Sequence, residues 1–396
     1  MPEFQELLAA VEGGRSPVAL SGAAAIHRVH IAAGVGLMTG RPVVMVCPGE
    51  SEGLKLARDL AAFTGVQVPV LGPREFVFHN TASASRQWEH RRLTQMSRLS
   101  RGETPFLVAT VEGLLQRTIP PKELDRCRTV LRTGGRCDLN ELADTLSAAG
   151  YVRCQQVESV GQFALRGGIL DLFSPAMDQP VRAEFFGDEV DAMGIFDPAT
   201  QRRIENIDAA EILPAGEVLP QLAPGGLAGL AKKIEKLAGK ALQSGNRSLA
   251  ENLEGDARSL SQGHSFPAAD RYLSLIYPEL ATAADYLPKD ACLIFDQCAR
   301  TADRGRSYQW QLEEDVKLLL ERGELDGSCG VLSRTFPQLC AMLEDWAVVY
   351  LDSFTTSSAP TPPRTMISLP AKQLPPFLAS LETAVQDLAH YQNSGF

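Results

Sequence analysis

The chain has 396 residues, which is enough for two to three domains at about 150 residues each. Its hydrophobic share of 44% and charged share of 22% exclude a largely disordered chain. The net charge of −10 argues against a dedicated nucleic-acid binder, and no apolar run is long enough to span a membrane. There is no signal-peptide pattern, and the eight cysteines show no zinc-type spacing, so we expect reduced thiols and a cytoplasmic location.

The first part of the chain alternates strands with helices. Short apolar runs predict buried strands at 18–20, 43–47 and 105–111, and a further short apolar run lies at 66–71. The stretches between them predict helices at 23–38, 50–64 and 85–101. This alternation is typical of a parallel, doubly wound α/β sheet.

The charge and the strand spacing both change near residue 137. Residues 86–136 carry eleven basic and five acidic side chains, whereas residues 137–220 carry five basic and fifteen acidic ones. The basic segment predicts either a solvated helix face or a surface that meets phosphate or acidic protein. After a helix predicted at 138–150, closely spaced strands are predicted at 151–158, 162–166, 168–173, 180–186 and 189–196.

The α/β pattern resumes after residue 214. A Lys-rich helix without a capping residue is predicted at 230–243, a strand at 291–296, a charged helix at 300–322 and a strand at 347–351. We therefore expect an α/β domain whose halves, 1–127 and 214–352, flank an inserted α+β domain of hairpins at 128–213.

The last part of the chain has the composition of a linker. Residues 353–371 are rich in Ser, Thr and Pro, and an amphipathic stretch follows at 377–388. We assign 353–396 to a linker and the first helix of a following domain, and we expect the chain to be the front part of a longer protein.

A P-loop would lie after the first strand, but its chemistry is missing. The motif G-x-x-x-x-G-K-[ST] needs a lysine for the phosphates and a hydroxyl for magnesium. Here the sequence reads Ser21-Gly22-Ala23-Ala24-Ala25-Ile26-His27. No H-E-x-x-H or G-x-S-x-G pattern replaces it, so we predict no catalytic, cofactor or metal site, and a binding module is favoured over an enzyme.

The segment 161–198 has the strongest local pattern. Gly187-Asp188 predicts a two-residue hairpin turn, which would pair Phe186 with Glu189, Phe185 with Val190, Glu184 with Asp191 and Arg182 with Met193. Strand alternation then gives one apolar face, formed by Val181, Ala183, Phe185, Val190 and Ala192. The opposite face carries Arg182, Glu184, Phe186, Glu189, Asp191 and Met193. A phenylalanine among charges indicates either a residue covered by a neighbouring segment or an anchor for a protein partner.

These residues carry a family resemblance. The runs 163–173, 182–189 and 196–198 resemble the second domain shared by the excision-repair protein UvrB and the bacterial transcription-repair coupling factors. Residues 208–215 continue the likeness, which covers about residues 15–350. The missing P-loop lysine and the lack of helicase motifs favour the N-terminal UvrB-like module of the coupling factors, a degenerate P-loop, helicase-like α/β fold with an inserted UvrA-binding domain.

The resemblance implies a function in recruitment. In that family the module binds the damage sensor UvrA through its second domain, and it packs against the C-terminal domains of the same protein to hold it repressed. Arg166, Arg182 and Phe186 match the UvrA-contacting positions, with Glu184 and Asp188 as neighbours. DNA and RNA polymerase would be contacted only by domains beyond Phe396.

Two other functions remain open from the sequence. The first is a UvrB-like, ATP-dependent DNA repair enzyme or translocase, against which the missing lysine counts. The second is a direct DNA-binding module that uses the basic segment 86–136.

Overall fold

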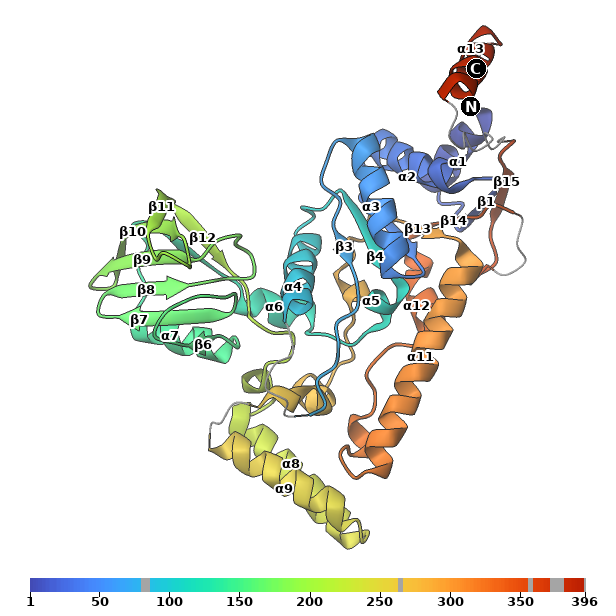
Figure 1. The fold of residues 1–396 in the computed structure, drawn as a ribbon. Helices are drawn as coiled ribbons and strands as arrows, with labels where there is room; N and C mark the ends of the chain where they lie inside the picture. Colours follow the sequence, from blue (N-terminus) through green and yellow to red (C-terminus); the bar gives the residue numbers. More distant parts are fainter. Residues whose placement is uncertain (80–85, 263–265, 355–358, 371–380, 395–396) are drawn as a thin grey trace.

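The chain folds around two β-sheets in the computed structural model, which describes residues 1–79, 86–262, 266–354, 359–370 and 381–394 (Figure 1). In the larger sheet, seven parallel strands lie in the order β15-β1-β14-β13-β2-β4-β3. Their bounds are Val18–Ser21 (β1), Val43–Cys47 (β2), Val70–Leu71 (β3), Phe106–Thr110 (β4), Cys292–Asp296 (β13), Ala347–Leu351 (β14) and Thr365–Ser368 (β15). A mixed α/β fold with a parallel sheet, as predicted, is therefore confirmed.

Helices cover both faces of this sheet. Along β2, Val43, Met45 and Cys47 join one apolar core, while Val44 and Val46 join the other, because side chains alternate along a strand. The first core is closed by α1 (Pro2–Glu12), α2 (Ala25–Thr39) and α3 (Glu50–Thr64). The second is closed by α4 (Gln87–Ser100), α5 (Val111–Leu115), α6 (Pro121–Cys127), α11 (Cys298–Glu321) and α12 (Phe336–Met342).

Two long helices form a hairpin that projects from the second core (Figure 1). They are α8 (Gly226–Gln243), the Lys-rich helix, and α9 (Arg247–Ser261). As predicted, α8 has no side-chain cap; Gly225 precedes it in the left-handed region. The remaining short helices are η1 (Pro220–Leu222), η2 (Pro267–Tyr272), α10 (Leu273–Ile276), η3 (Ala283–Tyr286), η4 (Gly327–Cys329) and η5 (Leu343–Asp345).

The smaller sheet lies to one side of the larger one and has the order β11-β10-β9-β8-β7-β6 (Figure 1). Its strands pair antiparallel except β6 with β7. They are Val152–Arg153 (β6), Gln162–Arg166 (β7), Ile169–Leu172 (β8), Val181–Phe186 (β9), Glu189–Phe196 (β10) and Arg203–Asn206 (β11). Its inner face packs against α7 (Leu139–Ala148) and the ribbon of β5 (Thr129–Arg132) with β12 (Ala209–Ile212), giving this region its own apolar core.

Two sequence expectations are wrong here. The strand predicted at 151–158 is reduced to Val152–Arg153, because the chain then leaves the sheet edge and buries Val157 in a small core with Ala164 and Phe196. The stretch 353–371 is not only linker, since β15 within it forms the edge strand beside β1.

The amphipathic stretch predicted at 377–388 lies partly outside the described residues. Its described part belongs to α13 (Leu381–Asn393), which has no buried residue. Leu381, Val385 and Leu388, the apolar side chains of the predicted stripe, are 58–83% exposed.

Candidate protein-binding surface

The β9–β10 hairpin closes at the predicted turn but contains a bulge. Phe186 pairs with Glu189 and Phe185 with Val190, as expected. The register then shifts by one residue, so Glu184 faces Ala192 and not Asp191. A β-bulge places two residues of one strand opposite one residue of its partner. The residues of β10 that follow the bulge therefore lie on the opposite face from the one a regular ladder would give them.

The bulge exchanges two side chains between the faces of the sheet. Met193, expected on the outer face, is 2% exposed and belongs to the inner core, whereas Ala192 is removed from that core. Before the bulge the predicted faces hold: Val181 and Ala183 are buried, and Phe186 is 84% exposed. Phe185 is only half-buried, at the margin of the inner core. An exposed phenylalanine therefore stands at the tip of the outer face.

Asp171 organises the charges of this outer face. It is fully buried in β8, between Ala164 of β7 and Arg182 of β9 in the strand register. Arg182 donates two hydrogen bonds to its carboxylate, from Nε at 2.6 Å and from Nη2 at 2.9 Å. Arg166 donates a third, from Nη2 at 2.5 Å. One buried carboxylate thus holds both arginines that the sequence singled out.

Arg182 is fixed from two sides. Its guanidinium lies 4.8 Å from the centre of the buried Phe196 ring, a cation–π arrangement. The hydrogen bond to Asp171 is the main cause that raises the pKa of Arg182 above its ordinary value. The side chain of Arg182 is 20% exposed and that of Arg166 is 52% exposed. Arg166 is therefore the more accessible cation.

The remaining predicted residues lie on the same face or at its turn. Glu184 accepts a 2.6 Å hydrogen bond from Arg203 of β11. Asp188 lies in the turn with its side chain exposed, while its carbonyl accepts from the amide of Cys137 at 2.8 Å. Sequence reasoning missed Asp171 and Arg203. The signal for Asp171 was a lone carboxylate in the apolar strand Ile-Leu-Asp-Leu.

Much of the basic segment 86–136 is neutralised within the chain. Arg92 is fully buried and pairs with Glu217, while Arg101 and Arg128 both pair with Glu211. These ion pairs, together with Arg136–Glu189, join the basic segment to the acidic segment that follows it. The two opposite charge excesses seen in the sequence are therefore partly complementary surfaces of one molecule.

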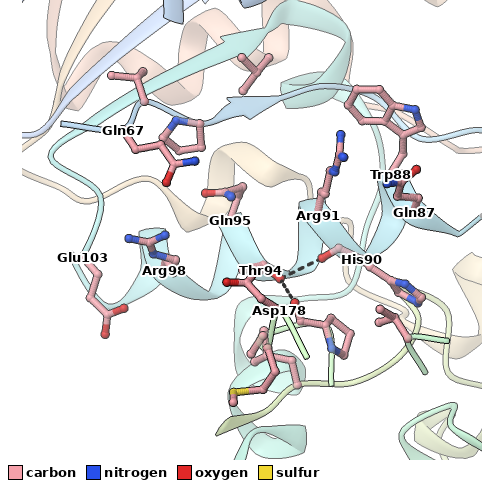
Figure 2. Close-up of a pocket in the computed structure, with 18 of the residues that line it drawn as sticks. Gln67, Gln87, Trp88, His90, Arg91, Thr94, Gln95, Arg98, Glu103 and Asp178 are labelled. Carbon is pink, nitrogen blue, oxygen red and sulfur yellow. Dashed lines mark hydrogen bonds between the residues drawn. The ribbon is translucent and has the colours of Figure 1, made fainter. Parts of the chain in front are cut away.

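A groove of about 1060 Å³ lies between the two sheets (Figure 2). Its floor is α4, from which Thr94 donates a 2.8 Å hydrogen bond to the carbonyl of Pro175. Arg91 and Arg98 line it and are exposed, and Arg91 stacks on Trp88 at 5.3 Å. His90, also in its lining, contacts the carbonyl of Ala215 through Nε2 at 3.0 Å.

The loop where a P-loop was considered packs against another part of the chain. Gly22 has φ of 87°, and a side chain there would meet the carbonyl oxygen of Leu369, just past β15. The guanidinium of Arg28 is buried behind this loop. It pairs with Asp296 and donates to the carbonyl of Ala23 at 2.9 Å. Arg28 stands where the lysine of G-x-x-x-x-G-K would fall if Gly22 were the first glycine, a correspondence that sequence reasoning missed.

The described residues hold no cluster of His, Cys, Asp and Glu suited to a metal ion. All eight cysteines are unpaired thiols. Burial raises the pKa of Cys47, Cys292 and Cys340 to about 12, which keeps these thiols protonated and unreactive at neutral pH. No helix among the described residues is both long and apolar enough to cross a membrane.

The segment that forms the second sheet is similar to a known interaction domain. Residues 130–217 match the family described as the UvrB interaction domain. This match covers the sheet, the hairpin and Asp171.

The chain as a whole is similar to transcription-repair-coupling factors. It is 26% identical to the factor of Bacillus subtilis (strain 168) over 100% of this chain and 34% of that protein. It is 23% identical to the factor of Staphylococcus aureus (strain MRSA252) over 97% of this chain and 33% of that protein. A match to the Escherichia coli (strain K12) factor is 32% identical, over 44% of this chain and 15% of that protein.

These findings confirm the resemblance to the UvrB-like module of the coupling factors. The chain spans about a third of the length of the curated relatives that it matches from end to end.

Proposed function

We propose that this chain is the non-catalytic, UvrB-like N-terminal module of a transcription-repair coupling factor, and that it recruits UvrA to stalled RNA polymerase during nucleotide excision repair. The observation that carries the proposal is Phe186, which is 84% exposed on the face that holds Arg166 and Arg182. This face belongs to a region that matches the UvrB interaction domain.

The chemistry of the face suits a protein partner. An exposed aromatic ring gains free energy when a partner's pocket removes it from water. Arginines on the same face supply donors for the partner's carboxylates, and aromatic residues with arginine dominate binding hot spots. UvrA is the partner that the family match supports.

Truncation of Phe186 tests this proposal. We expect Phe186→Ala to weaken UvrA binding by about 2 kcal/mol, roughly thirtyfold, because the ring is the anchor of the face. The melting temperature should stay unchanged, since the ring makes little contact with its own domain. Calorimetric titration with UvrA measures the affinity, and a thermal melt checks the fold.

A matched control is Phe354→Ala, which removes an 80% exposed phenylalanine outside the second sheet. It should bind UvrA like the unmodified chain. Equal affinity of Phe186→Ala and the unmodified chain would overturn the proposed binding face.

Support for a role without catalysis comes from the loop after β1. Arg28, the cation that follows this loop, is buried in a pair with Asp296, and the carbonyl of Leu369 lies against Gly22, so neither is presented to a phosphate as in a P-loop. We therefore expect no ATP binding in a titration and no turnover above background. Hydrolysis that disappears on substitution of Gly22 would favour the alternative of a UvrB-like enzyme.

The same face is suited to an autoinhibitory contact. If the C-terminal domains of the longer protein cover Phe186 and Arg166, UvrA and those domains compete for one surface. The isolated 396-residue chain should then bind UvrA more tightly than the full-length factor does. Equal affinities would contradict the competition and leave only recruitment.

Direct DNA binding by the basic segment has less support. Arg92, Arg101, Arg128 and Arg136 already pair with carboxylates of this chain, which lowers the positive charge available to phosphates. Contacts with DNA and RNA polymerase are accordingly assigned to other domains of the coupling factor. The measured affinity of this chain for plain duplex DNA tests the assignment. It would be contradicted if the chain bound DNA in a salt-dependent way and the double variant with Arg91→Ala and Arg98→Ala bound it more weakly.

A further inference from the structure

Asp171 is an unusual residue for the surface of a sheet. It is 0% exposed, although it lies on the outer face of β8. Removing a carboxylate from water is costly unless cations and hydrogen-bond donors surround it. Among the described residues, the cations that pair with Asp171 are the guanidinium groups of Arg166 and Arg182.

The two arginines differ in how many of their N–H groups remain available to a partner. Arg182 uses Nε and Nη2 on Asp171, and its Nη1 lies 3.4 Å from the carbonyl of Gln201. The Nε–Nη2 edge of Arg182 is therefore already engaged by Asp171 and is not presented to a partner's carboxylate. Arg166 gives only Nη2 to Asp171 and is half exposed. It can keep that contact while its other nitrogens face outward.

We propose that Asp171 is the positioning residue of the binding face, an inference that rests on the proposed function. Its carboxylate fixes Arg166 and Arg182 on the same face as Phe186 before a partner arrives. A pre-ordered cation loses less conformational freedom on binding than a mobile one, so the complex is tighter. The partner surface that fits this face has an apolar pocket for Phe186 and a carboxylate that accepts hydrogen bonds from Arg166.

The test is Asp171→Asn in the 396-residue chain. The amide keeps the shape but removes the charge, and its NH₂ group opposes an arginine N–H, so the two guanidiniums lose their common anchor. We expect UvrA binding at least tenfold weaker by calorimetry, at a temperature where the variant is folded.

The matched control is Asp270→Asn. Asp270 is also buried and holds one arginine with two hydrogen bonds, from Arg74 at 2.5 and 2.9 Å. It lies in η2, outside the second sheet. We expect this variant to lose stability as Asp171→Asn does but to bind UvrA normally, which separates positioning from a general loss of stability.

Arg166→Lys gives a second test that leaves the buried carboxylate in place. The lysine keeps the positive charge but loses the planar group held by Asp171, so binding should weaken several-fold while the melting temperature barely moves. In the Asp171→Asn background the same change should add little, because Arg166 is already unanchored.

The outcomes distinguish this inference from the proposed function. If Phe186→Ala and Arg166→Ala leave UvrA binding unchanged, the proposed face is wrong. If both variants weaken binding but Asp171→Asn does not, the face stands and the positioning role of Asp171 is overturned. The same conclusion follows if the effects of Asp171→Asn and Arg166→Lys on the binding free energy are fully additive. Should Asp171→Asn fail to fold, an unchanged affinity of Arg166→Lys overturns it equally.

Discussion

The two sheets use the same pair of residue types for opposite purposes. In the larger sheet, Asp296 at the end of β13 pairs with Arg28, and both side chains are at most 4% exposed. In the smaller sheet, Asp171 pairs with Arg182 and Arg166, whose side chains are 20% and 52% exposed. The first pair encloses its cation in the interior after β1, whereas the second holds cations on the same face as an exposed ring.

The difference lies in what covers each carboxylate. Asp296 sits between parallel strands, with helices on both sides of the sheet, so its arginine is enclosed as well. Asp171 lies on the outer face of a largely antiparallel sheet that has helix and ribbon packed on its inner side. The small core of Val157, Ala164 and Phe196 covers part of that outer face, while Arg166 and Phe186 stay exposed there for a partner.

The largest expected effect comes from expressing the region of the smaller sheet without the region of the larger one. If 128–213 is an inserted domain with its own core, expression of these residues alone should give a soluble unit that melts cooperatively. Its apolar core contains Phe163, Leu172 and Val181, all at most 1% exposed, which supports independent folding. A broad, non-cooperative transition followed by circular dichroism would mean that the sheets depend on each other.

Arg28→Ala should destabilise the larger sheet by about 3–5 kcal/mol, because it leaves the buried Asp296 carboxylate without its cation. Urea denaturation measures the change. UvrA binding by the folded fraction should be unchanged, since the smaller sheet is not altered. A loss of less than about 1 kcal/mol would show that water or another group replaces the arginine at Asp296.

Arg182→Ala should affect both stability and binding. Asp171 would keep only its bond to the half-exposed Arg166, so we expect a loss of about 2 kcal/mol in unfolding free energy, less than for Arg28→Ala. The comparison is sharpened by Arg203→Ala, which removes an ion pair of partly exposed side chains on the same face and should change stability little. Equal stability of Arg182→Ala and the unmodified chain would contradict the importance of the Asp171 clamp.

The smallest expected effect concerns pH at the junction of the two regions. Desolvation lowers the pKa of His90 below its ordinary value of 6.5, and its ring contacts the carbonyl of Ala215. The unfolded chain therefore binds the proton more readily than the folded one. The stabilising contribution is fully present above pH 6.5 and is lost as pH falls through the lower folded-state pKa.

His90→Gln checks this effect. The amide can still donate to the carbonyl of Ala215 but does not titrate, so the difference in unfolding free energy between the two chains should grow below pH 6.5 in favour of the variant. Parallel stability curves from pH 7.5 to about pH 5 would contradict the assignment to His90.

The sequence by itself determined the elements whose pattern is local. The helix Glu50–Thr64 and the strands Val43–Cys47, Gln162–Arg166 and Glu189–Phe196 have the predicted bounds. Periodicity, glycines and turn residues act over a few neighbours, which is the range that a sequence pattern records. The face on which Phe186 lies followed from the same alternation, because the residue precedes the bulge, whereas its exposure was left open by the sequence.

Only the tertiary structure decided features that join distant segments. Whether 365–368 is linker or strand depends on hydrogen bonding to β1, which composition does not record. The bulge between Val190 and Ala192 arises in strand pairing and reverses the faces of Ala192 and Met193. The clamp on Asp171 needs three strands side by side, since a buried carboxylate is stable only where the fold brings its cations together.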